Sequence, residues 1–174
     1  VTRDYDLKVE RLPGGAPVLS VIGGKITTYR RLAEAALVRV LPLLGRTSRS
    51  WTAAAALPGG DLPQGSFSQF LAHVRTRWPF LSEPTTLRLA RAYGTRLALI
   101  LGDADGFEAL GGTFGEDLSR AEVCYLREHE WARTPEDILW RRTKLGLRMS
   151  APESLRLARY LQESDFNAFA GGGL

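Results

Sequence analysis

The first part of the chain alternates apolar and polar residues in two short runs separated by a turn. The run YDLKVER carries its apolar residues at every second position, and the run APVLSVI follows Pro13, Gly14 and Gly15. A period of two is typical of a β-strand, and a Pro/Gly turn between two such runs favours an antiparallel pairing. The pattern therefore predicts a β-hairpin.

A helix is expected directly after the second strand. Apolar residues recur from Ile26 to Leu44 with the spacing of one helical face, and Pro42 and Gly45 are expected to end the helix. Residues 1–44 are thus predicted to form a hairpin followed by a helix.

The rest of the chain divides into two regions that differ in composition and periodicity. Residues 45–65 are rich in Gly, Pro and Ser and read as a connector. Residues 66–174 show helical periodicity throughout, with helix starts marked by Ser82, Thr134 and Ser150. The predicted fold class is mostly α, with a small β-hairpin and helix followed by an all-helical bundle.

One helix of this bundle is expected to turn a particular face inward. Between residues 118 and 129, the residues at helical spacing are Leu118, Ala121, Tyr125 and His129. These four positions are predicted to face the core.

The amino-acid composition argues against several kinds of site and segment. Cys124 is the single cysteine, which excludes a disulfide framework and a multi-cysteine metal cage within one chain, and no metal site is expected. No run of about 18 apolar residues occurs, so no membrane span or signal peptide is predicted. The chain starts without Met and enters strand alternation at once, so we expect a segment of a longer protein.

The 174-residue chain carries a net charge of +4, which favours attraction to anions. The segment WRRTK, residues 140–144, combines an aromatic residue with cations, as single-stranded nucleic-acid binders do. Glu136 and Asp137 precede it on the same expected helix, which favours a packing role over nucleic-acid binding.

The segment SVIGGKITTYRRLAE carries the clearest chemical signal. Gly23 and Gly24 remove side chains where the strand gives way to the helix, so a ligand can approach the backbone. The first N–H groups of the helix and the charge of Lys25 both favour an anion there, and Thr27 and Thr28 add hydroxyls. The combination suits a phosphate, a carboxylate or a ring that gathers negative charge, and the alternative is a tight turn with a solvated lysine.

Several motifs in order resemble those of one family. TRDY, then GGKITTYRRLAE, LPGG and HEWARTPEDILWRRTKLGL resemble the C-terminal third of the FAD-dependent (aerobic) glycerol-3-phosphate dehydrogenases. The resemblance runs from Thr2 to about Leu161. It implies that residues 1–44 complete the FAD-binding domain and that residues 66–174 form the helical C-terminal cap domain.

The resemblance also implies roles for individual residues. Gly23, Gly24, Lys25, Ile26 and Thr27 match the stretch that binds the flavin ring, and Lys25 also faces the substrate pocket. Arg3 matches the arginine beside the active site, so Lys25 and Arg3 are the candidate catalytic residues. The loop that holds the FAD diphosphate and the general base lie outside this chain, so the isolated chain is expected to be inactive.

The implied parent is an oxidoreductase of glycerol metabolism. It oxidises sn-glycerol 3-phosphate to dihydroxyacetone phosphate and passes electrons through FAD to a quinone. We expect this parent in the cytoplasm, peripheral on the cytoplasmic membrane and homodimeric.

Two other functions stay open. A glycerol-phosphate oxidase would hand its electrons to oxygen instead of a quinone. A helical interaction module would have no catalytic role; if it bound nucleic acid, an oligonucleotide titration would weaken steeply with salt.

Overall fold

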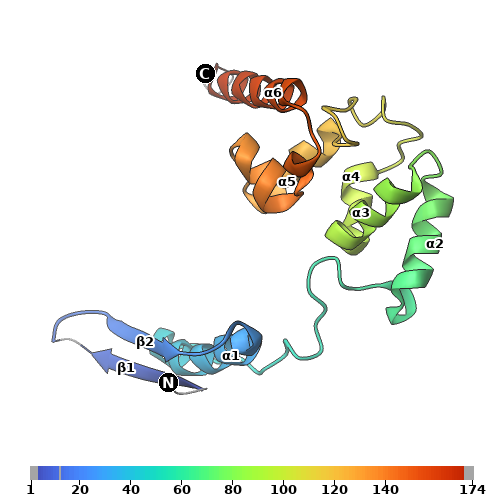
Figure 1. Ribbon diagram of the computed structural model, residues 1–174. Coiled ribbons are helices and arrows are strands. Elements are labelled where there is room, and N and C mark those ends of the chain that lie inside the picture. Colours follow the sequence, from blue (N-terminus) through green and yellow to red (C-terminus); the bar gives the residue numbers. More distant parts are fainter. Residues whose placement is uncertain (1–3, 12, 171–174) are drawn as a thin grey trace. The chain divides into compact units, whose positions relative to one another are not determined.

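The computed structural model describes the backbone of residues 4–11 and 13–170, with side chains in these ranges except at residue 64 and at residues 164–170. Two compact units divide the chain, Val1–Ala56 and Leu57–Leu174 (Figure 1). The boundary falls within the stretch 45–65. As the sequence predicts, the fold is mostly helical, with a small two-stranded antiparallel sheet that precedes the helices.

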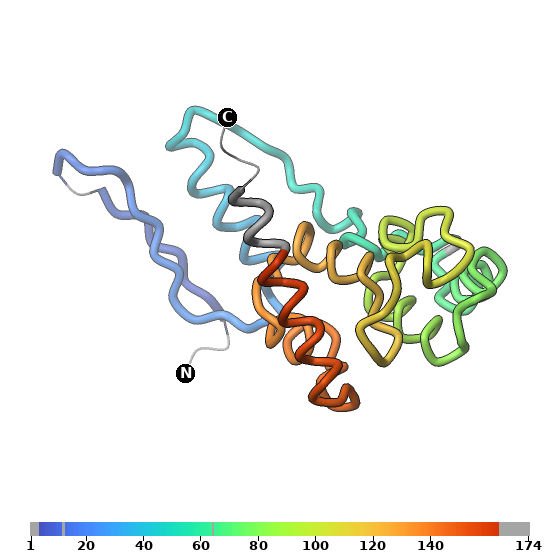
Figure 2. The backbone as a smooth tube through the Cα atoms, turned by 90° about the horizontal axis from the view of Figure 1, so that it is seen from above, coloured from blue at the N-terminus to red at the C-terminus, as the bar shows by residue number. Residues whose placement is uncertain are grey.

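The first unit begins with the predicted hairpin. Strand β1, Tyr5–Arg11, pairs with strand β2, Pro17–Gly23, in antiparallel register from Tyr5↔Gly23 to Arg11↔Pro17 (Figure 2). The chain then passes into the 3₁₀ turn η1, Ile26–Thr28, the helix α1, Tyr29–Val40, and the 3₁₀ turn η2, Leu41–Leu44. Gly45 ends this run in the left-handed conformation, as expected for a helix C-terminus.

The apolar residues of these elements are not buried. No described residue of β1, β2, η1, α1 or η2 reaches the buried class, and Val38 on α1 is 66% exposed. Two strands and one helix offer too few faces to enclose a core. The first unit therefore leaves much apolar surface uncovered.

We expect the first unit to be the less protected part of the 174-residue chain in hydrogen exchange. Amides open locally where few apolar contacts hold the structure, and the hairpin and α1 lack a core while the second unit has one. Exchange measured by mass spectrometry or NMR should be faster across residues 5–44 than in the helices that follow. Slowest exchange in the hairpin would contradict this.

The second unit is built from helices (Figure 1). No helix among the described residues is long and apolar enough to span a membrane. In chain order the elements are the 3₁₀ turn η3 Pro63–Gly65, α2 Phe67–Arg77, α3 Glu83–Tyr93, the 3₁₀ turn η4 Gly94–Arg96, α4 Leu97–Leu101, α5 Arg120–Glu130, the π-helix η5 Asp137–Arg142, the 3₁₀ turn η6 Leu145–Leu147, and α6 Ala151–Ala170.

The helix starts expected from the sequence are confirmed. The Ser82 hydroxyl accepts the N–H of Thr85 at 3.3 Å at the start of α3, and Thr134 Oγ1 accepts the N–H of Asp137 at 3.2 Å. The Ser150 N–H donates to the Glu153 carboxylate at 2.7 Å. Each cap pairs a group that the helix end leaves unpaired, which fixes where the helix begins.

One core holds the second unit together. The fully buried side chains come from α2 to α6 and the segments between them, and the largest are Leu97, Leu118, Leu126, Ile138, Leu145 and Leu157. Because apolar burial is the main favourable term in folding, this core is what makes the second unit compact.

The inward face of α5 differs from the predicted one. Leu118 and Tyr125 are buried as expected, but His129 is exposed and lies against the Tyr125 ring, with centroids 4.8 Å apart. The buried positions include Glu122 and Leu126 instead. The prediction for His129 was wrong because this residue, although on the same helical face as Glu122, lies in the last turn of α5, which ends at Glu130.

Candidate functional site

The site predicted from the sequence lies at the corner between β2 and α1. Gly23, the last residue of β2, has a φ of 79°, and Gly24 has a φ of 97°. Lys25 returns to an extended conformation, with φ −127° and ψ 152°, and the helical turn begins at Ile26. The strand is therefore turned into a helix within two residues.

Glycine is required here by conformation. Residues with a side chain rarely adopt a φ near 97°, and Gly24 does so without strain. A Cβ at Gly24 would lie 3.5 Å from Leu32 Cδ2 and 3.7 Å from Tyr5 Cβ, which is ordinary contact. The backbone angle, rather than lack of space, selects glycine at this position.

The first helical turn at the corner has backbone N–H groups without a hydrogen-bond partner inside the helix. The first hydrogen bond of the turn is donated by the Thr28 N–H to the Lys25 carbonyl oxygen at 2.9 Å. The N–H groups of Ile26 and Thr27 precede it, and such first-turn groups have no partner within a helix. They give the corner a partial positive charge beside the Lys25 ammonium group.

The side chains at the corner are open to solvent. Ile26 is 89% exposed, and Lys25 and Thr27 are also exposed. No ion pair in the described part of the chain involves Lys25. An exposed apolar residue next to an unpaired cation can contact a flat ring and the negative edge of that ring at once.

Five of the six candidate residues are thus contiguous, from Gly23 to Thr27, and form what we call the GGK corner. Arg3, the other candidate catalytic residue, lies outside the described residues. The strand–helix junction was visible in the sequence because both glycines and the lysine are neighbours along the chain.

Farther along α1, Glu34 holds the segment that follows the helix. Its carboxylate accepts the Thr52 N–H at 3.2 Å and also the Thr52 hydroxyl, and Arg30 lies 3.4 Å from it. Hydrogen bonds from the side chains of Ser50 and Thr52 keep the pKa of Glu34 below its usual range. Residues 50–52 therefore pack against α1 in the first unit.

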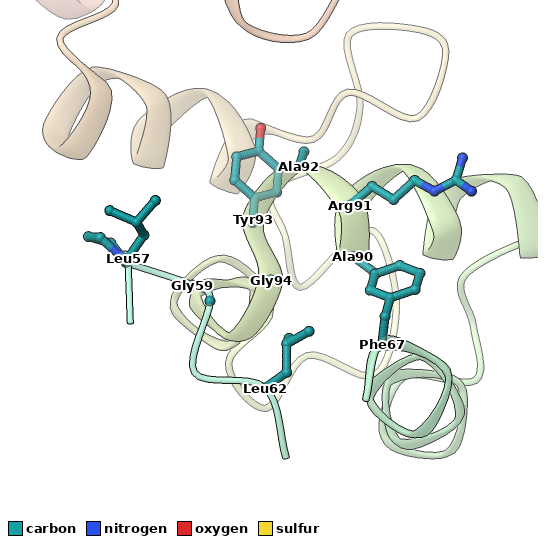
Figure 3. A pocket seen from close by; sticks show the side chains of 11 residues that line it. Leu57, Gly59, Leu62, Phe67, Ala90, Arg91, Ala92, Tyr93 and Gly94 are labelled. Atoms are coloured by element: carbon teal, nitrogen blue, oxygen red, sulfur yellow. The ribbon is translucent and has the colours of Figure 1, made fainter. Parts of the chain in front are cut away.

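A shallow pocket of about 450 Å³ in the second unit contains the LPGG motif (Figure 3). Gly59 accepts the Thr95 N–H at 3.1 Å, and a Cβ on Gly94 would lie 1.9 Å from the Gly59 oxygen. The backbones of the motif and of the end of α3 cross here, which explains the glycines. Arg91 points away from the hollow, and the Tyr93 hydroxyl is bonded to Glu122, so few polar groups converge on a ligand.

The basic segment 140–144 is satisfied within the second unit. Arg141 lies 2.7 Å from Asp137, and Arg142 donates to the Glu130 carbonyl oxygen at 2.7 Å and lies 3.6 Å from its carboxylate. Backbone N–H groups of Arg133 and Thr134 hold the pKa of Asp137 well below its usual range. The contacts of Arg142 join η5 to the end of α5, and the contact of Arg141 lies within η5.

A buried ionic cluster was missed by the sequence analysis. Glu122 is 1% exposed, and its two carboxylate oxygens lie 2.7 and 2.9 Å from the guanidinium of Arg88. The Tyr93 hydroxyl donates to Glu122 at 2.6 Å, and Asp117 lies 2.6 Å from Arg88. No sequence signal joins positions 88 and 122, because an acidic residue in the first turn of a helix is ordinary.

The cluster shifts two pKa values. Burial acts to lower the pKa of Arg88, but the carboxylates of Glu122 and Asp117 outweigh it and raise the pKa overall. Burial and the neighbouring Glu122 carboxylate raise the pKa of Tyr93 far above its usual value. Both groups therefore keep their protons, and the cluster is a fixed ionic element joining α3 and α5.

Metal ligands do not gather in the part of the chain that the structure describes. No three His, Cys, Asp or Glu side chains come together there in an arrangement that could hold a metal ion.

Comparison with known proteins shows the family to which this chain belongs. Residues 50–159 match the family described as the C-terminal domain of alpha-glycerophosphate oxidase. The aerobic glycerol-3-phosphate dehydrogenase of Escherichia coli (strain K12) is 43% identical over 94% of this chain and 32% of its own length. The glycerol-3-phosphate dehydrogenase of Pseudomonas aeruginosa is 46% identical over 93% of this chain and 31% of its own length.

A third relative carries a different name. The D-erythritol 1-phosphate dehydrogenase of Brucella abortus (strain 2308) is 38% identical over 97% of this chain and 33% of its own length. This chain therefore spans about a third of the length of the curated relatives it matches. All three names describe dehydrogenases of a polyol phosphate.

Proposed function

Because this chain belongs to the family of FAD-dependent glycerol-3-phosphate dehydrogenases and oxidases, we propose that it is the C-terminal portion of an enzyme that oxidises sn-glycerol 3-phosphate to dihydroxyacetone phosphate. The observation that carries the proposal is the GGK corner, where two glycines with positive φ precede the first helix N–H groups and a lysine that has no ion pair among the described residues. Arg3 is proposed to assist substrate binding.

The corner fits the flavin ring chemically. Gly23 and Gly24 have no side chains to hold a ring away from the backbone, and the exposed Ile26 offers an apolar surface. The N–H groups of Ile26 and Thr27 and the Lys25 charge suit the ring edge that carries N1 and O2. Bound FAD supplies the acceptor for the hydride that leaves the substrate carbon.

Lys25 has two effects in this proposal. Its charge stabilises negative charge at the flavin edge, and it attracts the phosphate dianion of the substrate. Both effects need the ammonium group to be free of an internal partner, and in the described residues it has none. The turn at Gly23 and Gly24 brings Lys25 to the start of the helix.

The proposal also covers the electron acceptor and the cellular location of the full-length enzyme. We propose that the electron acceptor is a quinone and that the full-length protein is homodimeric and peripheral on the cytoplasmic membrane. The second candidate is an oxidase that passes its electrons to oxygen, because the description of the matching family names an oxidase. Steady-state assays of the full-length enzyme with a quinone analogue or with oxygen distinguish them. Turnover with oxygen alone, at the rate seen with the quinone, would favour the oxidase.

We expect the purified 174-residue chain to be colourless and inactive toward glycerol 3-phosphate. It contributes one side of the proposed flavin site and contains no G-x-G-x-x-G loop for the FAD diphosphate. Absorption spectra after incubation with FAD and gel filtration check this, with the full-length enzyme as the control that retains yellow flavin. Stoichiometric flavin on the isolated chain would refute it.

A further inference from the structure

Both backbone polar groups of Lys25 are bonded to a single neighbour, Thr28. The Thr28 hydroxyl accepts the Lys25 N–H at 3.2 Å and donates to the Lys25 carbonyl oxygen at 2.8 Å. The Thr28 N–H donates to the same oxygen at 2.9 Å. Two of these three bonds depend on the hydroxyl.

The backbone on the other side of Lys25 is the most permissive in the region. Gly23 and Gly24 carry no Cβ, so the chain before Lys25 has more accessible conformations than any other residue pair would give. The direction in which the Lys25 side chain leaves the backbone, its Cα–Cβ bond, follows from the backbone angles, φ −127° and ψ 152°. The bonds to Thr28 are the contacts that hold these angles.

The two threonines of the GGK corner and its helix differ in their surroundings. Thr27 is exposed, and no hydrogen bond in the described part of the chain uses its hydroxyl, which leaves it free for a ligand. Thr28 is half-buried, and its hydroxyl lies against the backbone of Lys25. The sequence analysis did not separate them, because TT contains two identical residues.

We infer that Thr28 is a positioning residue: its hydroxyl fixes the backbone of Lys25 so that the ammonium group is held toward the flavin edge and the substrate dianion. The inference rests on the role proposed for Lys25. Valine keeps the shape of threonine and cannot form either bond, while serine keeps the hydroxyl. The two replacements therefore separate the hydroxyl from the volume of the side chain.

The test is a set of variants in the full-length flavoenzyme: Thr28→Val, Thr28→Ser, Lys25→Met, and Thr28→Val combined with Lys25→Met. Thr28→Val should lower kcat about tenfold and lower the flavin reduction potential, in both respects less than Lys25→Met, because misplacing a catalytic group costs less than removing it. Thr28→Ser should stay within about twofold of the unchanged enzyme, since the bonds are kept. In the Lys25→Met background, Thr28→Val should change nothing further.

Thr76→Val serves as the matched control. Thr76 on α2 also donates its hydroxyl to a backbone oxygen, that of Ala72 at 3.1 Å, and it lies in the second unit. This variant should leave kcat and the potential unchanged.

A second measurement does not depend on bound flavin. In the ¹⁵N-labelled 174-residue chain, Thr28→Val should speed amide exchange at Lys25, and Thr28→Ser should not. Unchanged exchange in Thr28→Val would overturn the inference even if the full-length variant failed to fold.

The outcomes separate this inference from the proposed function. An effect of Lys25→Met with none of Thr28→Val would overturn the positioning role and leave the role of Lys25 standing. Equal effects of Thr28→Val with and without Lys25 would show that Thr28 acts on the fold, which also overturns the inference. No effect of Lys25→Met would end the role of Lys25, and the positioning role with it.

Discussion

Replacing Lys25 with methionine in the full-length enzyme is expected to lower kcat about 10²-fold, as loss of one preorganised electrostatic group does. Methionine keeps most of the stem and removes the charge. That charge matters more after the flavin has taken up the hydride than before, so the transition state loses more than the ground state. The KM for glycerol 3-phosphate should also rise, because the lysine is proposed to attract the substrate dianion.

Lys8→Met is the matched control for this experiment. Lys8 is an exposed lysine on β1 of the same unit and lies 3.7 Å from Asp6. Its loss should leave both kinetic constants near those of the unchanged enzyme. A solvated turn lysine would behave in the same way, so near-normal kcat and KM in Lys25→Met would contradict the proposed role.

Replacing Glu122 with alanine is expected to lower the free energy of unfolding of the 174-residue chain by about 3–5 kcal/mol, as removal of one partner from a buried ion pair does. The Arg88 guanidinium would lose two of its bonds while its surroundings stay buried. The Tyr93 hydroxyl would lose its acceptor as well. Denaturant unfolding followed by far-ultraviolet circular dichroism measures the change.

An exposed ion pair of the same unit gives the control. Glu83 lies against Arg75 at the start of α3, and the Glu83 side chain is 77% exposed. Glu83→Ala should cost less than about 1 kcal/mol, because exposed pairs contribute little. If Glu122→Ala were as mild as Glu83→Ala, the cluster would not hold α3 and α5 together.

Local features of this fold could be predicted from the sequence. The hairpin follows from alternation around Pro13, Gly14 and Gly15, and the helix starts follow from Ser82 and Thr134. In each case the residues that decide the structure are near neighbours in the chain. Their physical chemistry therefore acts before any tertiary contact forms.

Features that join distant residues could not be predicted in the same way. Arg88 and Glu122 lie on different helices, and only the packing of α3 against α5 brings them together. The same pairing places the charged Glu122 on the buried face of α5, whereas His129, on that face but in the last turn of the helix, is exposed. Helical spacing finds apolar faces well and does not identify a charged residue that has a buried partner.

The candidate site shows the same division. The GGK corner could be predicted because Gly23, Gly24 and Lys25 adjoin, and the structure adds the backbone angles that require the glycines. That Thr28 and not Thr27 bonds to the Lys25 backbone could not be predicted from the sequence, because it depends on which of the two hydroxyls the turn directs toward that backbone. This chain spans about a third of the length of the glycerol-3-phosphate dehydrogenases compared above.

The most direct test of the account is the reduction potential of the flavin in the full-length enzyme, measured anaerobically with and without Lys25→Met. Lys25 is proposed to place a positive charge at the flavin edge, so removing that charge should lower the potential and slow bleaching of the oxidised flavin by glycerol 3-phosphate. Lys8→Met should leave both unchanged. Equal potentials and equal bleaching rates in the Lys25→Met variant and the unchanged enzyme would contradict the claim that the GGK corner lies against the flavin.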